Sequence, residues 1–402
     1  MIRLTALLAA LALNALALTG SAEAATLHLE RVVLVMRHGV RPPTQTNADL
    51  AKFSDRAWPD WPVAPGELTP HGGETVRLVG ATVRDAYRAK GLLPATGCAG
   101  AGQVTVWADG ADHRTQQSGA ILAEALQPGC GLTAPFSDVT PRDPIFGGYT
   151  TGPCSITAQS RALFPKPEAS DAELAQLKLA TDRLQAIFAP TACNGGPGVC
   201  FAKAGPAPAP FTGSLAEDLL LEFADGKPMS DVGWGRADAA AIRAVMPLHE
   251  RGFALIRQNL FLTTRSGNPM ARVILDALRG RPTSGGPQSG PDLKLMGLAG
   301  HDTNLALMAG IFGLAWTLPG EPDGTAPSTA LAFELWSDGA HEYVRPVIYY
   351  ETLEQLRTLK PAAAKILPLT FTDCADGPMG SCSLATVEAH LDAVLPADCT
   401  GT

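Results

Sequence analysis

The pattern of apolar and polar positions along the chain predicts strands that alternate with helices. Residues 32–36 are all apolar and mostly β-branched, a run too short for an independent helix and typical of a strand buried in a parallel or mixed sheet. We expect further strands at residues 103–108, 293–298, 330–336 and 343–350. We expect helices at residues 69–90, 116–126, 171–188, 215–223, 237–262 and 305–312. This alternation indicates an α/β fold in which helices flank a central sheet.

The character of the sequence changes between residues 138 and 292. Proline, glycine and cysteine are frequent in the first part of this stretch, and its expected elements are helices. We therefore predict an α/β domain formed by residues 25–137 and 293–402, interrupted by a smaller, mostly helical insertion domain at residues 138–292.

The first 24 residues have the features of a secretory signal peptide. Arg3 supplies the positive charge, residues 4–18 are mostly apolar, and Ala22-Glu23-Ala24 fits the small-residue rule for cleavage near Ala24. No later apolar span is long enough for a membrane anchor. We therefore expect a soluble protein that is exported to the periplasm or secreted.

Composition narrows the class of partner. The chain has 402 residues, of which 46% are hydrophobic, and a formal net charge of −8. The acidic balance argues against nucleic acid, because sequence-independent binding relies on lysine and arginine that neutralise phosphates. Any anionic ligand must therefore meet a local cluster of positive charge. We expect a small-molecule substrate and a monomeric protein.

The eight cysteines predict disulfides. They lie after the signal segment, at positions 98, 130, 154, 193, 200, 374, 382 and 399. An even number in an exported chain is typical of an oxidising compartment. The residues themselves leave the pairing open, although Cys193/Cys200 and Cys374/Cys382 flank turn-rich segments that could close as local loops. A zinc site is disfavoured, because no Cys-x-x-Cys pair exists and no histidine has ligand spacing from a cysteine.

Three expected strands each end in a polar turn, and these turns carry residue types that bind an oxyanion. They contribute Arg37, His38 and Arg41, then Arg114, and finally His301 and Asp302. Ligands of open α/β sheets bind at the carboxyl ends of the strands, where such turns converge. Each guanidinium can fork onto two oxygens, so the set predicts a phosphate site.

In such a site His38 is the expected nucleophile. Flanking arginines disfavour its protonated form and so keep the imidazole neutral. His38 would attack phosphorus in line to give a phosphohistidine, while Asp302 would protonate the leaving oxygen and then activate water. The need for a protonated Asp302 predicts an acidic pH optimum.

Asp302, Arg114 and Glu217 also have a structural interpretation. Asp302 could cap the helix that follows it by bonding to first-turn amides. Arg114 could be a salt-bridge partner of Asp109 or Asp112. Glu217, in an expected helix, could be an exposed glutamate without a specific role.

The stretch Arg37-His38-Gly39-Val40-Arg41-Pro42-Pro43 resembles the Arg-His-Gly-x-Arg-x-Pro signature of the histidine acid phosphatases, and His301-Asp302 resembles their second signature. The likeness extends through Trp58-Pro-Asp-Trp-Pro, Leu68-Thr-Pro-His-Gly-Gly-Glu, Gly233-Trp-Gly-Arg, Gly300-His-Asp-Thr-Asn-Leu-Ala and Trp316-Thr-Leu-Pro-Gly-Glu-Pro-Asp. It covers essentially the whole mature chain and is greatest to the bacterial periplasmic phytases, with the glucose-1-phosphatases as close relatives. The resemblance implies a phosphoglycerate-mutase-like α/β sheet domain flanked by helices, with a helical insertion.

Carried over residue by residue, the resemblance makes His38 the nucleophile and Asp302 the proton donor. It assigns phosphate binding to Arg37, Arg41, Arg114 and His301. Thr44 and Glu217 resemble substrate-pocket residues. The resemblance also implies the disulfides Cys98–Cys130, Cys154–Cys399, Cys193–Cys200 and Cys374–Cys382, and it implies neither a metal nor another cofactor.

One position departs from the family pattern. The bacterial phytases usually carry a lysine just after the Arg-x-Pro-Thr portion, where it helps to hold phytate, and here Gln45 takes its place. Losing a cation from a pocket for a highly anionic substrate weakens the case for phytate and leaves the core chemistry unchanged.

The leading hypothesis is a metal-independent phosphomonoesterase of the periplasm, with phytate (myo-inositol hexakisphosphate) as its first substrate. The alternatives are a glucose-1-phosphatase or a broad-specificity acid phosphatase. A non-catalytic inositol-phosphate binder is less favoured, because the nucleophile and acid candidates are both intact. Phosphoglycerate mutases share the Arg-His-Gly start, but the signal segment and the His-Asp pair argue against a cytosolic mutase.

Overall fold

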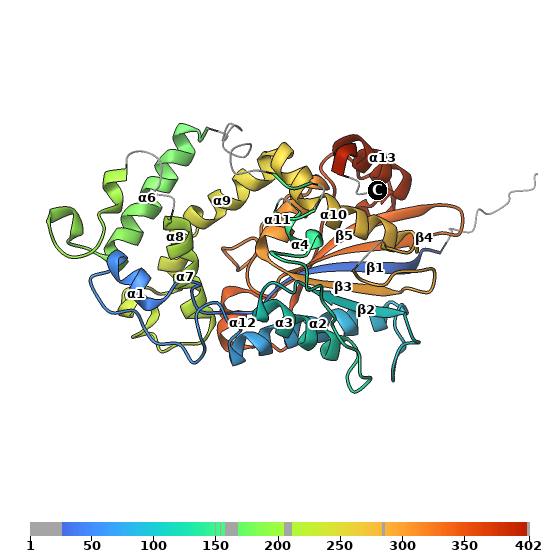
Figure 1. Cartoon of the computed structure of the whole chain (residues 1–402), viewed down its shortest axis with the longest axis horizontal. Helices are drawn as coiled ribbons and strands as arrows, with labels where there is room; N and C mark the ends of the chain where they lie inside the picture. Colours follow the sequence, from blue (N-terminus) through green and yellow to red (C-terminus); the bar gives the residue numbers. More distant parts are fainter. Residues whose placement is uncertain are drawn as a thin grey trace, which may run out of the picture.

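A mixed β-sheet lies at the centre of the computed structural model (Figure 1), which describes residues 26–148, 150–152, 154–156, 168–204, 211–283 and 286–399. The strands are β1 (His28–Arg37), β2 (Val104–Ala108), β3 (Leu295–Gly300), β4 (Ala330–Ser337), β5 (Glu342–Tyr350), β6 (Lys365–Pro368) and β7 (Cys382–Ser383). Their order is β2-β3-β1-β4-β5-β6, and β7 pairs with β5. β1, β2 and β3 are parallel, whereas the pairs from β1–β4 onward are antiparallel. The predicted α/β fold is confirmed, while the predicted signal peptide, residues 1–24, lies outside the described residues.

Helices cover both faces of the sheet (Figure 1). On one face lie α2 (Pro70–Ala89) and α3 (His113–Leu126), and on the other lie α10 (Leu260–Leu278), α11 (Asp302–Ile311) and α13 (Leu384–Val394). Successive residues of β1 point to opposite faces, so Val32 and Leu34 pack with one helix layer while Val33 and Val35 pack with the other. Burial on both faces explains why this strand is a continuous apolar run in the sequence.

A second group of helices lies to one side of the sheet, at the left of Figure 1. It comprises α1 (Asn47–Leu50), α6 (Asp171–Phe188), α7 (Thr212–Ala224), α8 (Ala239–Val245), α9 (Pro247–Gln258) and α12 (Leu353–Thr358). These helices share an apolar core that includes Leu184, Phe188 and Leu219. The short α4 (Pro144–Gly147) packs against α10. The 3₁₀ helices are Ala51–Phe53, Ala192–Asn194, Phe201–Ala204, Val232–Gly235, Pro378–Gly380 and Ala397–Cys399.

The helix predicted at residues 237–262 is divided in the structure. α8 ends at Val245, and Pro247 occupies the first position of α9, where a missing amide hydrogen costs nothing. Asn259 then starts a new helix, because its side chain accepts from the Leu262 amide at 3.2 Å. α10 continues to Leu278 and packs on β1 and α11. Part of the predicted insertion therefore covers the sheet, and the division into two domains stays a prediction.

Two glycines allow the loop after β1 to pass close to the start of α2. A Cβ atom on Gly39 would lie 2.2 Å from the carbonyl oxygen of Gly72, and one on Gly72 would lie 2.2 Å from that of Val40. The Thr69 amide donates to the same Val40 oxygen at 3.0 Å. This close approach fixes the path of the chain immediately after His38.

Four disulfides join the eight cysteines. The pairs are Cys98–Cys130, Cys154–Cys399, Cys193–Cys200 and Cys374–Cys382. They are the pairs that the family resemblance implies. Two of them close short loops, whereas Cys154–Cys399 ties the segment after α4 to the carboxyl-terminal end, 245 residues further along the chain.

Several carboxylic acids are buried in the folded chain. Glu351 has no exposed surface, and within the described residues both of its carboxyl oxygens lack a hydrogen-bond partner. Burial raises the pKa of Glu351 well above its ordinary value. Burial also raises the pKa of Glu222 to about 8 and that of Glu321 well above its usual range. These groups keep their protons in the folded chain at pH values where the unfolded chain has lost them.

We predict that Glu351→Gln reduces the loss of stability on raising the pH. An acid with a raised folded pKa stabilises the fold fully below its unfolded pKa, about 4.3 for glutamate, and this contribution is lost as the pH rises towards the folded pKa. The unfolding temperature should therefore be lower at about pH 7.5 than at about pH 5, and the variant should show a smaller difference. Thermal unfolding followed by circular dichroism measures it, with the exposed Glu354→Gln as control. An unchanged difference in the Glu351 variant contradicts the prediction.

Candidate active site

The register of the parallel strands brings their carboxyl ends together. Arg37 lies opposite Gly300, and Ala108 lies opposite Ala299. The pairing continues past β1, since the His38 amide donates to the carbonyl oxygen of Gly300 at 3.0 Å. The turns that follow β1, β2 and β3 are therefore neighbours in space.

His38 is buried at the end of β1, and one of its ring nitrogens keeps a lone pair. Its Nδ1 lies 2.8 Å from the carbonyl oxygen of Gly39. Because a carbonyl can only accept, Nδ1 carries the proton and Nε2 of the neutral ring has the lone pair. Burial, followed by the charges of Arg37, Arg41 and Arg114, lowers the pKa of His38 well below its usual range. A neutral imidazole with an available Nε2 is suited to nucleophilic attack.

Arg37 is enclosed by acceptors from separate elements. Its side chain is fully buried, and its Nη1 donates to Oδ2 of Asp323 at 3.1 Å and to the carbonyl oxygen of Thr325 at 2.7 Å. Its Nη2 contacts the carboxylates of Glu217 and Asp302, the latter at 3.2 Å. Asp323 and Thr325 precede β4, the antiparallel neighbour of β1, so the amino end of β4 completes the site.

Glu217 of α7 lies between two guanidiniums. It accepts from Arg37, and Nη2 of Arg41 lies 3.4 and 3.3 Å from its two oxygens. The alternative of an exposed helical glutamate is therefore wrong, since Glu217 is buried. Burial raises its pKa, but Arg41 and Arg37 outweigh burial and lower it below the ordinary value. An ionised carboxylate thus occupies guanidiniums that an oxyanion would use.

Asp302 opens α11 beside Arg37. Its Oδ1 accepts from the Thr303 amide at 2.6 Å, and its Oδ2 faces the guanidinium. Asp302 thus bonds to a first-turn amide of α11, as its structural interpretation predicts, while His301 is the N-cap residue and the side chain of Asn304 accepts from the His301 amide at 2.9 Å. Burial raises the pKa of Asp302, but Arg37 outweighs it, so the pKa is lowered below the ordinary value. In this arrangement Asp302 is ionised.

His301, Arg114 and Arg142 share the two aspartates of the turn after β2, and we call these five residues the outer cluster. Nε2 of His301 lies 2.7 Å from Oδ2 of Asp109, which is fully buried. Arg114, in the first turn of α3, contacts Asp112 at 3.0 Å. Arg142 contacts Asp112 at 2.6 Å and Asp109 at 3.3 Å. Arg114 thus has the salt-bridge partner of its structural interpretation and also belongs to the charge cluster around His301.

The outer cluster does not fit a metal centre. Ligand atoms of Asp109, Asp112 and His301 lie within 4.8 Å of one another. However, Arg142 already bridges the two carboxylates and balances their charge. The other group at metal-ligand distances in the described part of the chain includes Cys374 and Cys382, which are joined in a disulfide and supply no thiolate.

The expected substrate-pocket residues lie at the edge of this site. Thr44 and Gln45 are both exposed. The side chain of Thr44 and Nη1 of Arg114 each lie 3.6 Å from the position of a Cβ atom on Gly66, and Arg114 donates to the Gly66 carbonyl oxygen at 3.3 Å. The structure thus brings together Arg37, His38, Arg41, Arg114, Glu217, His301 and Asp302, with Thr44 beside Arg114. It gives Gln45 no contact with them.

Four residues that the structure places at the site, Asp109, Arg142, His249 and Asp323, are not among its predicted functional residues. Asp109 directly follows β2. Because ligands bind at the carboxyl ends of strands, its position in the sequence could have indicated that it lies near His301. Asp323 lies in the family-like segment that begins at Trp316. Arg142 and His249 give no such signal, although His249 is buried on α9 with Nε2 at 3.8 Å from Asp323.

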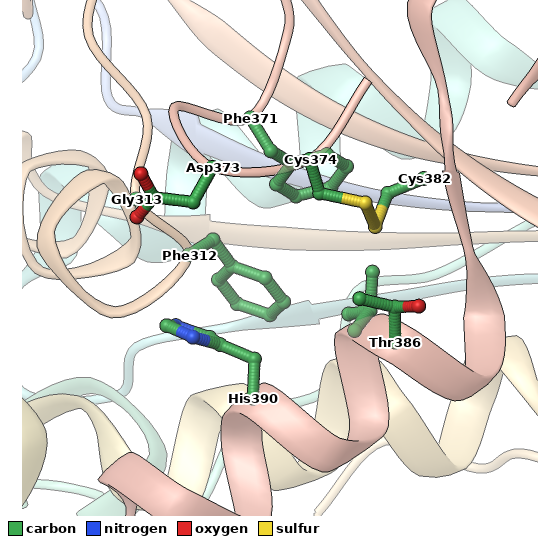
Figure 2. Close-up of a pocket in the computed structure, with 9 residues that line it drawn as sticks. Phe312, Gly313, Phe371, Asp373, Cys374, Cys382, Thr386 and His390 are labelled. Atoms are coloured by element: carbon green, nitrogen blue, oxygen red, sulfur yellow. A yellow bond between two sulfur atoms is a disulfide. The ribbon is translucent and has the colours of Figure 1, made fainter. Parts of the chain in front are cut away.

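A separate cavity of about 90 Å³ lies at the other end of α11 (Figure 2). Figure 2 shows Phe312, Phe371, the Cys374–Cys382 disulfide and His390 around it. The 10 residues of α11 span roughly 15 Å at the rise of an α-helix. This small, mostly apolar cavity is therefore not part of the site at His38.

The chain is similar over most of its length to known phosphatases. A family model described as the histidine phosphatase superfamily (branch 2) matches residues 28–172. Phytase AppA of Escherichia coli (strain K12) is 32% identical over 401 residues, which cover 89% of this chain and 90% of the relative. Glucose-1-phosphatase of Salmonella typhimurium is 24% identical over 385 residues, with coverage of 89% and 90%.

Solved structures show the same likeness. The apo form of Hafnia alvei phytase matches with a TM-score of 0.82 and 31% identity, over 95% of this chain and 100% of that chain. Hafnia alvei phytase in complex with myo-inositol hexakis sulphate matches with a TM-score of 0.80 and 30% identity, over 94% and 99%.

We predict that Glu217→Gln tightens the binding of orthophosphate. Removing the carboxylate frees the guanidiniums of Arg37 and Arg41 from an internal competitor, and we expect the dissociation constant to fall about tenfold at mildly acidic pH. Stability should fall as well, because two buried guanidiniums lose a partner. Isothermal titration with orthophosphate measures the binding.

The matched control is Glu222→Gln on the same helix. The pKa of Glu222 is raised to about 8 by burial, so its carboxyl is already neutral in acid and the substitution removes no charge. This variant should bind orthophosphate as the wild type does. Unchanged or weaker binding in the Glu217 variant would show that Glu217 does not compete with the anion.

Proposed function

The chain belongs to branch 2 of the histidine phosphatase superfamily and is a phosphoric monoester hydrolase, and we propose that it transfers the phosphoryl group first to His38 and then to water. The observation that carries the proposal is the state of His38, a buried neutral ring whose Nε2 has a lone pair. Three guanidiniums and the carboxyl group of Asp302 surround it.

Three arginines would hold the phosphoryl oxygens, with His301 beside them. The Nε atoms of Arg37, Arg41 and Arg114 are buried and have no acceptor among the described residues. An oxyanion would satisfy these donors with charge-assisted hydrogen bonds. Several arginines elsewhere in the chain also leave Nε without an acceptor, so the support comes from the convergence of three of them on one histidine.

The first chemical step would form a bond between Nε2 of His38 and phosphorus while the ester P–O bond breaks. Asp302 would give its proton to the leaving alkoxide, which departs as an alcohol. In the second step Asp302 would take a proton from water as the water oxygen attacks phosphorus. Orthophosphate leaves, His38 is neutral again, and one water has been consumed for each ester.

Asp302 must gain a proton before it can act as an acid. Arg37 lowers its pKa in the structure. A bound phosphate dianion would draw on the charge of Arg37 and bring negative charge close to Asp302, and both effects raise the pKa of that carboxyl group. We therefore propose that the substrate itself prepares Asp302, which favours activity at acidic pH.

Phytate is the substrate that we propose first. Relatives at 30% identity or more carry the name phytase, and one of them is known in complex with myo-inositol hexakis sulphate. A sugar phosphate such as glucose 1-phosphate is the second candidate, because Gln45 is neutral and the positive charge around Arg37 is already balanced by carboxylates. Arg37 contacts three carboxylates, those of Glu217, Asp302 and Asp323.

Export is a further part of the proposal. Among the residues that the structure describes, no helix is long and apolar enough to cross a membrane. Four disulfides fit an oxidising compartment. Together with the signal-like first 24 residues, they support a periplasmic or secreted protein, which we propose acts as a monomer.

We predict that Asp302→Asn accumulates a phosphohistidine at His38. The variant lacks the group that activates water, whereas p-nitrophenyl phosphate releases p-nitrophenolate without needing a proton, so the first step should outrun the second. p-Nitrophenyl phosphate with a radiolabelled phosphoryl group should label the protein. The reaction is quenched in alkaline detergent, which preserves the N–P bond. The double variant with His38→Ala should carry no label, and His38→Ala alone should lose turnover in the presence of EDTA. Turnover in His38→Ala excludes the mechanism.

We predict that Gln45→Lys improves the hydrolysis of phytate but not that of glucose 1-phosphate. An added cation at the edge of the site should lower KM for phytate several-fold, because it adds roughly one charge-assisted contact. KM for glucose 1-phosphate should stay within about twofold of the wild-type value. Release of orthophosphate from each substrate measures both constants. The neutral variant Gln45→Met is the control for side-chain size. If both lysine and methionine change the two substrates alike, Gln45 does not set specificity.

A further inference from the structure

Arg142 reaches solvent more than the other site arginines. Its side chain is 30% exposed, against 0%, 9% and 13% for Arg37, Arg41 and Arg114. Its Nη1 and Nη2 contact Asp109 and Asp112, and through Asp109 it lies beside His301. The guanidinium therefore lies at the rim of the site, next to residues that would hold the phosphoryl group.

The segment that carries Arg142 is anchored to the site. The next residue, Asp143, accepts from Nε1 of Trp107 at 2.9 Å and from the Ile145 amide at 2.9 Å. The side-chain amide of Asn304 in α11 donates to the carbonyl oxygen of Phe146 at 3.0 Å. These bonds connect α4 to β2 and to α11, so the position of Arg142 is set by the same elements that position His301.

The charges of the site are unevenly divided. Around Arg37 and Arg41 there are two guanidiniums and three carboxylates, those of Glu217, Asp302 and Asp323. The outer cluster instead has two guanidiniums and two carboxylates, and burial lowers the pKa of His301, which favours its neutral form. A second anionic group on a substrate is therefore repelled less by the outer cluster than by the inner one.

We propose that Arg142 is a specificity-determining residue that binds a second phosphoryl group of a polyphosphorylated polyol while the first lies at His38. A guanidinium has five N–H donors, and two contacts with aspartates leave donors for an incoming oxygen. Arg142 thereby supplies a cation beside the site, which the neutral Gln45 does not. This inference rests on the proposed transfer of the phosphoryl group to His38.

The test compares two inhibitors of p-nitrophenyl phosphate hydrolysis. One is myo-inositol hexakissulphate, a polyanion that occupies the site without being hydrolysed as a phosphate ester, and the other is orthophosphate, which carries a single group. In Arg142→Gln the inhibition constant of the hexakissulphate should rise about tenfold, the loss of one charge-assisted contact. The inhibition constant of orthophosphate and KM for p-nitrophenyl phosphate should stay within about twofold.

Two further variants separate recognition from structure. Arg142→Lys keeps the charge and should keep most of the affinity for the hexakissulphate. Arg236→Gln breaks an ion pair of similar exposure with Asp55, at 2.8 Å in the second group of helices, and should lower the unfolding temperature without changing either inhibition constant.

The outcomes are distinguishable from failure of the proposed function. If the wild type does not hydrolyse p-nitrophenyl phosphate, the phosphatase mechanism is wrong, and titration calorimetry with the hexakissulphate still tests Arg142. If both inhibitors weaken equally in Arg142→Gln, Arg142 acts only through Asp109 and Asp112 on His301, and the specificity role is wrong. If neither inhibitor changes, Arg142 does not contact the substrate.

Discussion

The buried guanidinium of Arg37 is the constraint on which the rest of the site depends. A cation with no exposed surface is tolerated only where anions and carbonyl oxygens surround it, because the energetic cost of removing it from water is large. Here the acceptors come from α7, from α11 and from the segment before β4. Satisfying one side chain at the end of β1 therefore holds the second group of helices against the sheet. The same contacts place Asp302 next to His38, so the charge balance of Arg37 also fixes the geometry that the proposed chemistry needs.

The parts of the site that a single sequence predicts are those that strand ends determine. Residues 32–36 indicate a buried strand, and the polar residues after it must lie at the edge of the sheet together with those after β3. Burial of Glu217 could not be predicted in the same way, because it depends on how α7 packs against Arg37 rather than on its own helix. The position of Arg142 could not be predicted either, because it follows from the hydrogen bonds of Asp143 and Asn304 to elements distant in the sequence. The end of α9 was missed for a local reason, the cap supplied by Asn259.

Two buried carboxyl groups of this protein have pKa values shifted in opposite directions, although burial raises both. Glu351 has no cation beside it, so desolvation decides and raises its pKa. Asp302 is also buried, but Arg37 lies 3.2 Å away and reverses the direction. The first group stabilises the fold in acid, whereas the second must gain a proton before it can act as the proposed acid, and a bound anion would favour this by drawing on the charge of Arg37. Acidic conditions thus favour the folded state through Glu351 and the proposed chemistry through Asp302.

Each side chain that we expect to bind phosphate already has a carboxylate partner. Glu217 contacts Arg37 and Arg41, Asp112 contacts Arg114, and Asp109 contacts His301. A phosphoryl group must therefore exchange with internal ion pairs, which lowers its affinity for the site relative to unpaired guanidiniums. The same exchange lowers the affinity for orthophosphate, the product, because the carboxylates recover their partners as it leaves. Interactions that weaken ground-state binding alike for substrate and product do not slow the chemical step, whereas a tight product complex would. The carboxylates of the site are thus consistent with turnover, and they explain why a site built to bind anions is lined by so many acidic residues.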